Sequence, residues 1–214
     1  MPVDVKKAHC IFEYIYFARL DSKIDNISVY EARIRGGATL AKTYPVDADL
    51  VCGVPDSGLA SAKGYSEESG IPFGLAFHKN SYVGRTFIKP TQKERESSVK
   101  IKLSVLESVV KGKRIVLVDD SIVRGTTISN LITMLRKAGA TEVHVRISSP
   151  PFLYPCYFGT DVPSNKQLIA SSHSTEEIEE LQNMVGDLPI CRACFDSHYP
   201  MEVPKQDISA LLES

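Results

Sequence analysis

The sequence lacks three features that would assign it to a special class of protein. Its 25 basic and 26 acidic residues leave a formal net charge of -1, so there is no basic excess of the kind that binds nucleic acid. No apolar run approaches the ~20 residues that a membrane-spanning helix requires. The first residues, Met-Pro-Val-Asp-Val-Lys-Lys, lack the apolar core of a signal peptide. We therefore expect a cytoplasmic protein whose partners are neither nucleic acid nor membrane.

Cysteine is too sparse and too scattered for a disulfide framework. Of the five cysteines only Cys191 and Cys194 form a close pair, and structural disulfides are uncommon in a reducing compartment. Internal repeats and low-complexity tracts are missing as well. The 43% of hydrophobic residues in a 214-residue chain is enough to bury a core. The length predicts one α/β domain of ordinary size, with or without a small appendage.

Apolar runs alternate with helical patterns along most of the chain. The apolar runs predict buried strands at residues 9–18, 49–54, 71–77, 114–119 and 142–147. Between them, helical patterns cover residues 27–44, 59–69 and 127–138, although two adjacent glycines weaken the first. Strands separated by helices of this length imply parallel βαβ units with right-handed crossovers. We predict an α/β fold with a doubly wound, mostly parallel sheet over residues 9–150.

The most informative stretch is residues 114–127, where an apolar strand ends in Asp119 and Asp120. A loop with hydroxyls and one glycine follows, and then a helix begins. Ligand sites of open α/β sheets lie beyond the carboxyl ends of their strands, and a helix N-terminus favours phosphate. Two carboxylates beside a phosphate loop suggest Mg²⁺, sugar hydroxyls or both. The alternative is a strand that ends in an ordinary acidic turn.

Two other segments could belong to the same site. Pro55-Asp56-Ser57-Gly58 is a strand-to-helix turn of small residues, which lets a backbone approach a ligand or simply reverses the chain. Residues 78–98 are polar and basic and have no sustained period. A long loop of this kind in a compact domain is either a lid that closes over a substrate or a solvated surface segment.

At this point the residues resemble a known family. Residues 118–127 resemble the phosphoribosylpyrophosphate (PRPP) loop of type I phosphoribosyltransferases. More narrowly, the chain is similar to the phosphoribosyltransferase half of the amidophosphoribosyltransferase family. The matching motifs occur in order along nearly the whole chain, at residues 10–19, 53–57, 82–88, 118–127, 139–145, 148–151 and 169–173.

The resemblance implies a reaction and a metal. In the family, ammonia joins C1 of the ribose of PRPP and pyrophosphate leaves, giving 5-phosphoribosylamine for purine synthesis with the help of Mg²⁺. Carried over by position, Asp119 and Asp120 are expected to be catalytic and, with Ser57, to hold Mg²⁺. The expected PRPP-binding residues around them are Pro55, Asp56, Ser57, Ser121, Ile122, Val123, Arg124, Gly125, Thr126 and Thr127.

The resemblance also makes residues 78–98 a lid. Tyr82 and Arg85 are expected to be catalytic, with the Arg85 guanidinium facing the pyrophosphate. Thr86 and Ile88 are expected to touch the substrate from the same lid, and Lys79 just before it. Ser81 stands where cluster-bearing relatives can have a basic residue that helps bind nucleotides, so inhibition by purine nucleotides stays open.

Some members of the family carry a [4Fe–4S] cluster on four cysteines. Their matching positions here are Cys10, Cys156, Cys191 and Cys194, which leaves Cys52 as a small core residue. Four thiolates also suit zinc, and four unligated thiols are the alternative to both. The segment between residues 185 and 191 is shorter than the family leads us to expect.

The resemblance leads to a domain division and to several partners. We expect a phosphoribosyltransferase core at residues 1–165, with its lid at 78–98, and a helical tail at 166–214 that carries the cysteine pair. No segment matches the family's N-terminal glutaminase, so ammonia is expected to come from solution or from a separate glutaminase domain or subunit. A homo-oligomer is expected too. The alternatives are a non-catalytic nucleotide-binding or PRPP-binding regulatory module, a truncated remnant, or a phosphoribosyltransferase for a base such as orotate.

Overall fold

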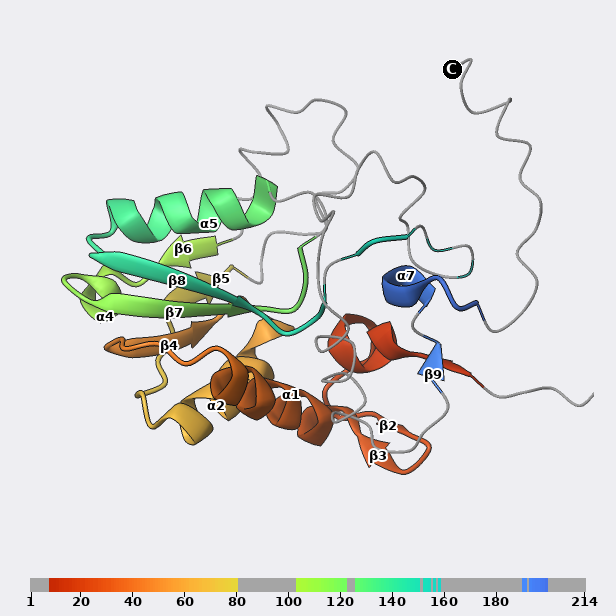
Figure 1. The fold of residues 1–214 in the computed structure, drawn as a ribbon. Coiled ribbons are helices and arrows are strands. Elements are labelled where there is room, and N and C mark those ends of the chain that lie inside the picture. The colour runs from red at the N-terminus through yellow and green to blue at the C-terminus, as the bar shows by residue number, and fades with distance from the viewer. Residues whose placement is uncertain are drawn as a thin grey trace, which may run out of the picture.

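The structure is a computed structural model, which describes residues 8–80, 103–122, 126–150, 152–154, 156, 158, 190–191 and 193–199. Its centre is a parallel sheet in which β7 (Arg114–Asp119) lies between β4 (Leu50–Gly53) and β8 (Glu142–Ile147). Figure 1 shows α1 (Val29–Thr43) and α2 (Gly58–Ser69) on one face of this sheet and α5 (Thr126–Lys137) on the other. The predicted α/β fold with a mostly parallel sheet is thus confirmed.

The apolar run of β7 fills both layers of the core. Ile115 and Leu117 pack in the cluster that contains the buried face of α5, whereas Val116 and Val118 pack in the cluster with α1 and α2. All four are fully buried. Successive side chains of a strand point to opposite faces, so a strand covered on both faces reads as an unbroken apolar run.

Helices α1 and α2 pack with their backbones in contact. A Cβ on Gly37 of α1 would lie 1.8 Å from the carbonyl oxygen of Ser61, and one on Gly64 of α2 would lie 2.0 Å from that of Ile34. No side chain fits at either position. Gly37, which weakens the helical pattern in the sequence, is therefore what permits the helix to pack at this depth.

Residues 9–18, which we predicted to be a buried strand, fold differently. Only β1 (His9–Cys10) is extended, and the chain then makes a π-helical turn, η1 (Glu13–Phe17). Tyr14 and Ile15 of this turn are buried while its last two residues are exposed. The prediction was wrong because a short apolar run has the same composition whether it is a buried strand or a buried helical turn.

The predicted strand at residues 71–77 is also misplaced. Phe73 makes only a single parallel bridge to Val51, and the strand β5 covers Phe77–Lys79. It pairs antiparallel with β6 (Leu103–Val105), which precedes the short helix α4 (Glu107–Val110). The predicted helices at residues 27–44, 59–69 and 127–138 agree with α1, α2 and α5 to within about two residues at each end.

A third apolar cluster joins three segments that are far apart in the sequence. β1 pairs in parallel with β9 (Ile190–Cys191), and α7 (Ala193–Asp196) follows β9 (Figure 1). Phe12, Phe152 and Phe195 meet with ring centroids 4.7 to 5.9 Å apart. Near them the hairpin of β2 (Lys23–Ile24) and β3 (Ile27–Ser28) leads into α1. Most of the predicted helical tail at residues 166–214 lies outside the described residues.

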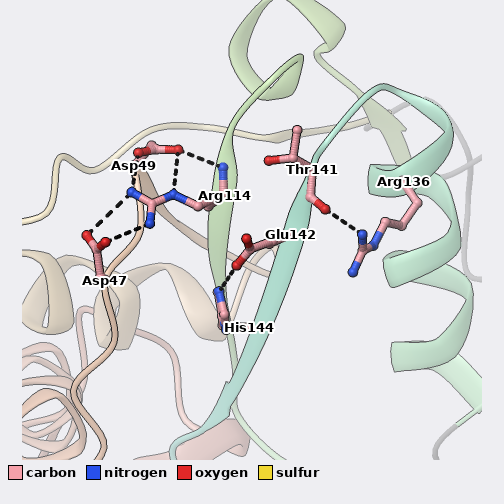
Figure 2. A network of polar contacts seen from close by, with 7 residues as sticks. All are labelled: Asp47, Asp49, Arg114, Arg136, Thr141, Glu142 and His144. Atoms are coloured by element: carbon pink, nitrogen blue, oxygen red, sulfur yellow. Dashed lines mark hydrogen bonds and ion pairs between the residues drawn. The ribbon is translucent and has the colours of Figure 1, made fainter.

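The amino end of the sheet is closed by polar contacts (Figure 2). Arg114, the first residue of β7, binds Asp47 at 2.7 Å and Asp49 at 2.8 Å. The side-chain and backbone hydrogen bonds from Arg114 to Asp49 lower the pKa of Asp49 to about 2. At roughly 3.3 Å per residue this network lies about 17 Å from the carboxyl end of the strand, so it anchors the sheet without reaching the candidate site. In the described part of the chain, no helix is both long and apolar enough to span a bilayer.

Candidate functional site

Asp119 and Asp120 lie side by side at the carboxyl end of the central strand. The residues are only 8% and 7% exposed, although both carry carboxylates. The Asp120 N–H donates to the Asp119 carboxylate at 2.9 Å, and the Ser148 N–H donates to the Asp119 carbonyl at 3.0 Å. The end of β7 is thus tied to the residue that follows β8, and the two carboxyl groups are held as a fixed pair.

The turn after β4 brings Ser57 to this pair. The Ser57 hydroxyl donates to one oxygen of the Asp120 carboxylate, and the Ser121 hydroxyl donates to the other. The Val54 N–H donates to the Val118 carbonyl at 2.9 Å, which fixes the turn against β7. Two segments that are 63 residues apart in the sequence therefore meet around one carboxylate.

Beside this turn, Lys79 of β5 forms an ion pair with Asp56. Both side chains are substantially exposed, 44% for Lys79 and 67% for Asp56. The peptide bond between Pro55 and Asp56 is cis, a feature that no sequence pattern indicated. The structure thus brings together the predicted residues Pro55, Asp56, Ser57 and Lys79 at the edge of the carboxylate pair.

Burial dominates the electrostatics of the pair. Burial and, to a smaller extent, the neighbouring charge of Asp120 together raise the pKa of Asp119 to about 7. Burial also raises the pKa of Asp120, against the hydrogen bonds from Ser121 and Ser57 and the positive charge of Arg33. Two carboxylates that are removed from water and repel each other favour a bound cation or sugar hydroxyls between them.

The phosphate loop is described only in part. Ser121 and Ile122 follow the carboxylates, and α5 begins at Thr126 with Thr127 exposed in its first turn. The predicted loop residues Val123, Arg124 and Gly125 lie outside the described residues. So do the four lid residues, Tyr82, Arg85, Thr86 and Ile88. Their predicted roles stay predictions.

The four cysteines predicted to share a cluster lie near one another. Cys10 and Cys191 are register partners in the pairing of β1 with β9. Burial first, and then the charges of Cys191 and Cys156, raise the pKa of Cys10 to about 11. Burial likewise raises the pKa of Cys194, and the charges of the other three thiols raise it by smaller amounts. Cys52, by contrast, lies fully buried within β4.

The four thiols have the donor chemistry of a metal–sulfur centre, since thiolates repel one another unless a cation lies between them. As placed, however, no three side chains of His, Cys, Asp or Glu among the described residues form a ready set of metal ligands. The four cysteines therefore fit a metal–sulfur cluster in residue type and in lying near one another, but their side chains are not arranged as metal ligands.

One residue that acts on this region, Arg33, was not among those predicted from the sequence. Arg33 is a charged residue on the buried face of α1, and its charge acts on Asp120. The signal was present in the sequence, because an arginine interrupts a stripe of small and apolar residues. Only the folded chain shows that the charge of Arg33 acts on Asp120.

A parallel α/β sheet with buried carboxylates at its carboxyl end, followed by a hydroxyl-bearing loop and a helix, defines a sugar-phosphate-binding protein of the phosphoribosyltransferase type. The family model described as "Phosphoribosyl transferase domain" matches residues 25–148. The chain belongs to this phosphoribosyltransferase family.

Individual relatives give a narrower match. An amidophosphoribosyltransferase of Methanocaldococcus jannaschii is 53% identical over 210 residues, which cover 92% of this chain and 45% of the relative. One of Bacillus subtilis is 49% identical over 221 residues, which cover 94% of this chain and 46% of the relative. The chain therefore resembles the phosphoribosyltransferase half of these enzymes and spans about half of their length.

A solved structure agrees with this match. The B. subtilis "glutamine phosphoribosylpyrophosphate (PRPP) amidotransferase … complexed with ADP and GMP" superposes with a TM-score of 0.81 at 49% identity. The match covers 93% of this chain and 48% of that one. The predicted resemblance to the amidophosphoribosyltransferases is confirmed over nearly the whole chain.

Proposed function

We propose that this chain transfers ammonia to C1 of PRPP, giving 5-phosphoribosylamine and pyrophosphate. The observation that carries the proposal is the buried pair of Asp119 and Asp120, with Ser57 bonded to it, in a chain about half of whose residues are identical to those of amidophosphoribosyltransferases. The reaction forms a C1–N bond and breaks the bond from C1 to the pyrophosphate oxygen. The bonding electrons leave with pyrophosphate, and the nitrogen releases one proton to solvent.

The described residues supply binding and orientation. Asp119 and Asp120 accept hydrogen bonds from the ribose hydroxyls, and the Ser121 hydroxyl and the first turn of α5 face the 5-phosphate. Lys79, whose side chain is 44% exposed at the edge of the site, adds positive charge for pyrophosphate. We place Tyr82 and Arg85 in a lid that keeps water from the reacting carbon.

Mg²⁺ fits the same residues. The carboxylates of Asp119 and Asp120 and the hydroxyl of Ser57 are hard oxygen donors, and burial of two adjacent anions favours a divalent cation. When bound, Mg²⁺ neutralises charge on the pyrophosphate and orients the sugar oxygens.

The chain of 214 residues should release pyrophosphate from PRPP with ammonium salts and Mg²⁺, and release none when glutamine replaces ammonium. The measurement is coupled detection of pyrophosphate, with a chelator of divalent metals as the metal-free control. PRPP that stays intact with ammonium and Mg²⁺ would contradict the catalytic role. If PRPP still bound in a calorimetric titration, the chain would be the non-catalytic binding module.

We further propose that Cys10, Cys156, Cys191 and Cys194 hold a [4Fe–4S] cluster, with zinc as the less favoured occupant. The mutual influence of their four charges and the register pairing of Cys10 with Cys191 support this assignment. Such a cluster ties the N-terminal segment, the segment after β8 and α7 together at one point.

Anaerobically purified protein should contain about four iron atoms per chain and absorb visible light. Cys194→Ser should remove most of this iron, because one of four thiolate ligands is lost. Cys52→Ala is the matched control: Cys52 is a buried cysteine outside the group, and its loss should leave the iron content unchanged. Metal analysis and sulfide analysis are the readouts. Stoichiometric zinc, or protein without metal, would contradict the assignment.

Three further expectations concern partners. We propose that glutamine-derived ammonia reaches this chain from a separate glutaminase domain or subunit, since the relatives named amidotransferase are about twice as long. Purine nucleotides are proposed as inhibitors, because the B. subtilis relative is described in complex with ADP and GMP. A homo-oligomer is proposed as the assembled form, which light scattering tests directly.

A further inference from the structure

Lys79 is a cation at the edge of the carboxylate pair, and it already has an anionic partner. Its ammonium group forms an ion pair with the Asp56 carboxylate. Lys79 is the last residue of β5, whereas Asp56 lies in the turn after β4, so 23 positions separate the two in the sequence. Both side chains are substantially exposed, at 44% and 67%. An anion from solvent can therefore reach this lysine, but it meets a carboxylate there.

The turn that carries Asp56 has a fixed backbone. The next residue, Ser57, donates a hydrogen bond to Asp120 through its hydroxyl. A Cβ on Gly58 would lie 2.7 Å from the Val118 carbonyl oxygen, so the turn packs directly on the end of β7. The backbone of the turn is thus held in place when a ligand binds, whereas the exposed side chain of Asp56 can rotate into solvent.

This ion pair lowers the affinity of the site for anions. Asp56, Asp119 and Asp120 bring three carboxylates to one edge of the sheet, and each repels an incoming phosphate group. A pyrophosphate group that binds Lys79 must also displace the Asp56 carboxylate, because the two anions compete for one positive charge. An ion pair between exposed side chains is weak, so a group with several negative charges can displace it.

We propose that Asp56 is an internal counter-ion that weakens the binding of pyrophosphate. It occupies Lys79 in the empty site, yields it to the pyrophosphate group of PRPP, and competes for it again once free pyrophosphate has formed. Binding that is equally tight before and during the reaction does not speed the chemical step, and product release limits turnover in many enzymes. Weaker binding of pyrophosphate therefore favours turnover. The inference rests on the proposed function and deepens it, because it gives Asp56 a role in product release.

The test measures the affinity of the chain for inorganic pyrophosphate by calorimetric titration, with Mg²⁺ and at low ionic strength. Asp56→Asn should bind pyrophosphate about fivefold more tightly than the parent, the factor by which an exposed ion pair competes. Glu107→Gln is the matched control, because it removes one negative charge from an exposed ion pair with Lys111, before the amino end of β7 (Figure 1). This control should bind pyrophosphate as the parent does.

A double-mutant cycle with Lys79→Met separates release of the lysine from simple repulsion. In the Lys79→Met background, Asp56→Asn should improve pyrophosphate binding by less than about twofold, because no ammonium group is left to release. A gain as large as in the parent background would overturn the proposal, since Asp56 would then act by repulsion alone.

Unchanged or weaker binding by Asp56→Asn would also contradict the proposal, as would a failure of parent and variant alike to bind pyrophosphate. If Asp56→Asn does not fold, Asp56→Ser decides by the same criteria. Failure of the proposed function looks different. The parent chain would then bind pyrophosphate, with the effect of Asp56 intact, but would not release it from PRPP in the presence of ammonium.

Discussion

Asp120→Asn and Asp119→Asn should each lower the rate of pyrophosphate release from PRPP by about 100-fold or more, the loss typical when a preorganised charged group is removed from a site. Both carboxyl groups are buried at the end of β7, and the oxygens of Asp120 are held by Ser57 and Ser121. Asparagine keeps the shape and removes the charge that attracts the metal and the ribose hydroxyls. The measurement is the rate with ammonium and Mg²⁺ at pH 8.

Asp119→Asn should leave the free energy of unfolding unchanged or raise it. Burial and the neighbouring charge raise the pKa of Asp119 from its ordinary value to about 7 in the folded chain. When the pKa of an acid is higher in the folded chain than in the unfolded chain, its ionised form destabilises the fold. This cost begins above the pKa of the unfolded chain and is fully present above the pKa of the folded chain. The contribution of Asp119 to the free energy of unfolding of the wild type therefore falls as pH rises from about 4 to 7. Asp119→Asn should unfold at an equal or higher temperature than wild type at pH 8.

A control separates loss of a site from loss of a fold. Asp49 is an exposed carboxylate at the other end of the sheet, where it binds Arg114. Asp49→Asn should keep nearly parental activity, since that network does not reach the carboxylate pair. Full activity in Asp120→Asn, or loss of activity together with a large fall in unfolding temperature, would contradict our assignment of the site.

Gly64→Ala and Gly37→Ala should each destabilise the chain by about 3 kcal/mol or more, at the upper end of overpacking effects. The added methyl group would meet a backbone carbonyl of the facing helix at 2.0 Å or 1.8 Å. Neither helix can yield locally, because the obstructing atoms are main chain. The two helices must separate or shift, and either change loosens the layer that carries Arg33 and Ser57. Urea unfolding followed by circular dichroism gives the free energy of unfolding.

Gly74→Ala is the matched control for this experiment. A Cβ at Gly74 would meet the end of the Leu50 side chain at 2.9 Å, and that side chain can rotate away. We expect a change below about 1 kcal/mol. If Gly64→Ala were as stable as Gly74→Ala, this result would contradict the close backbone contact between α1 and α2.

Local patterns were sufficient for much of this fold. The strands β4, β7 and β8 and the helices α1, α2 and α5 were predictable because hydrophobic period and turn residues are local signals. The segment at residues 9–18 was not, because its buried Phe12 packs against Phe152 and Phe195. Composition alone does not distinguish an extended run from a π-helical turn when the covering side chains lie so far away.

The sequence by itself determined the carboxylate pair. Asp119 and Asp120 end an apolar strand, and the ends of parallel strands are where ligands bind. Only the tertiary structure decided which groups act on Asp120: the hydroxyls of Ser57 and Ser121 donate to its carboxylate, and the buried charge of Arg33 favours its ionised form. The reason is physical. A strand and its turn depend on neighbours along the chain, whereas burial, pKa and hydrogen-bond partners depend on residues that only folding brings together.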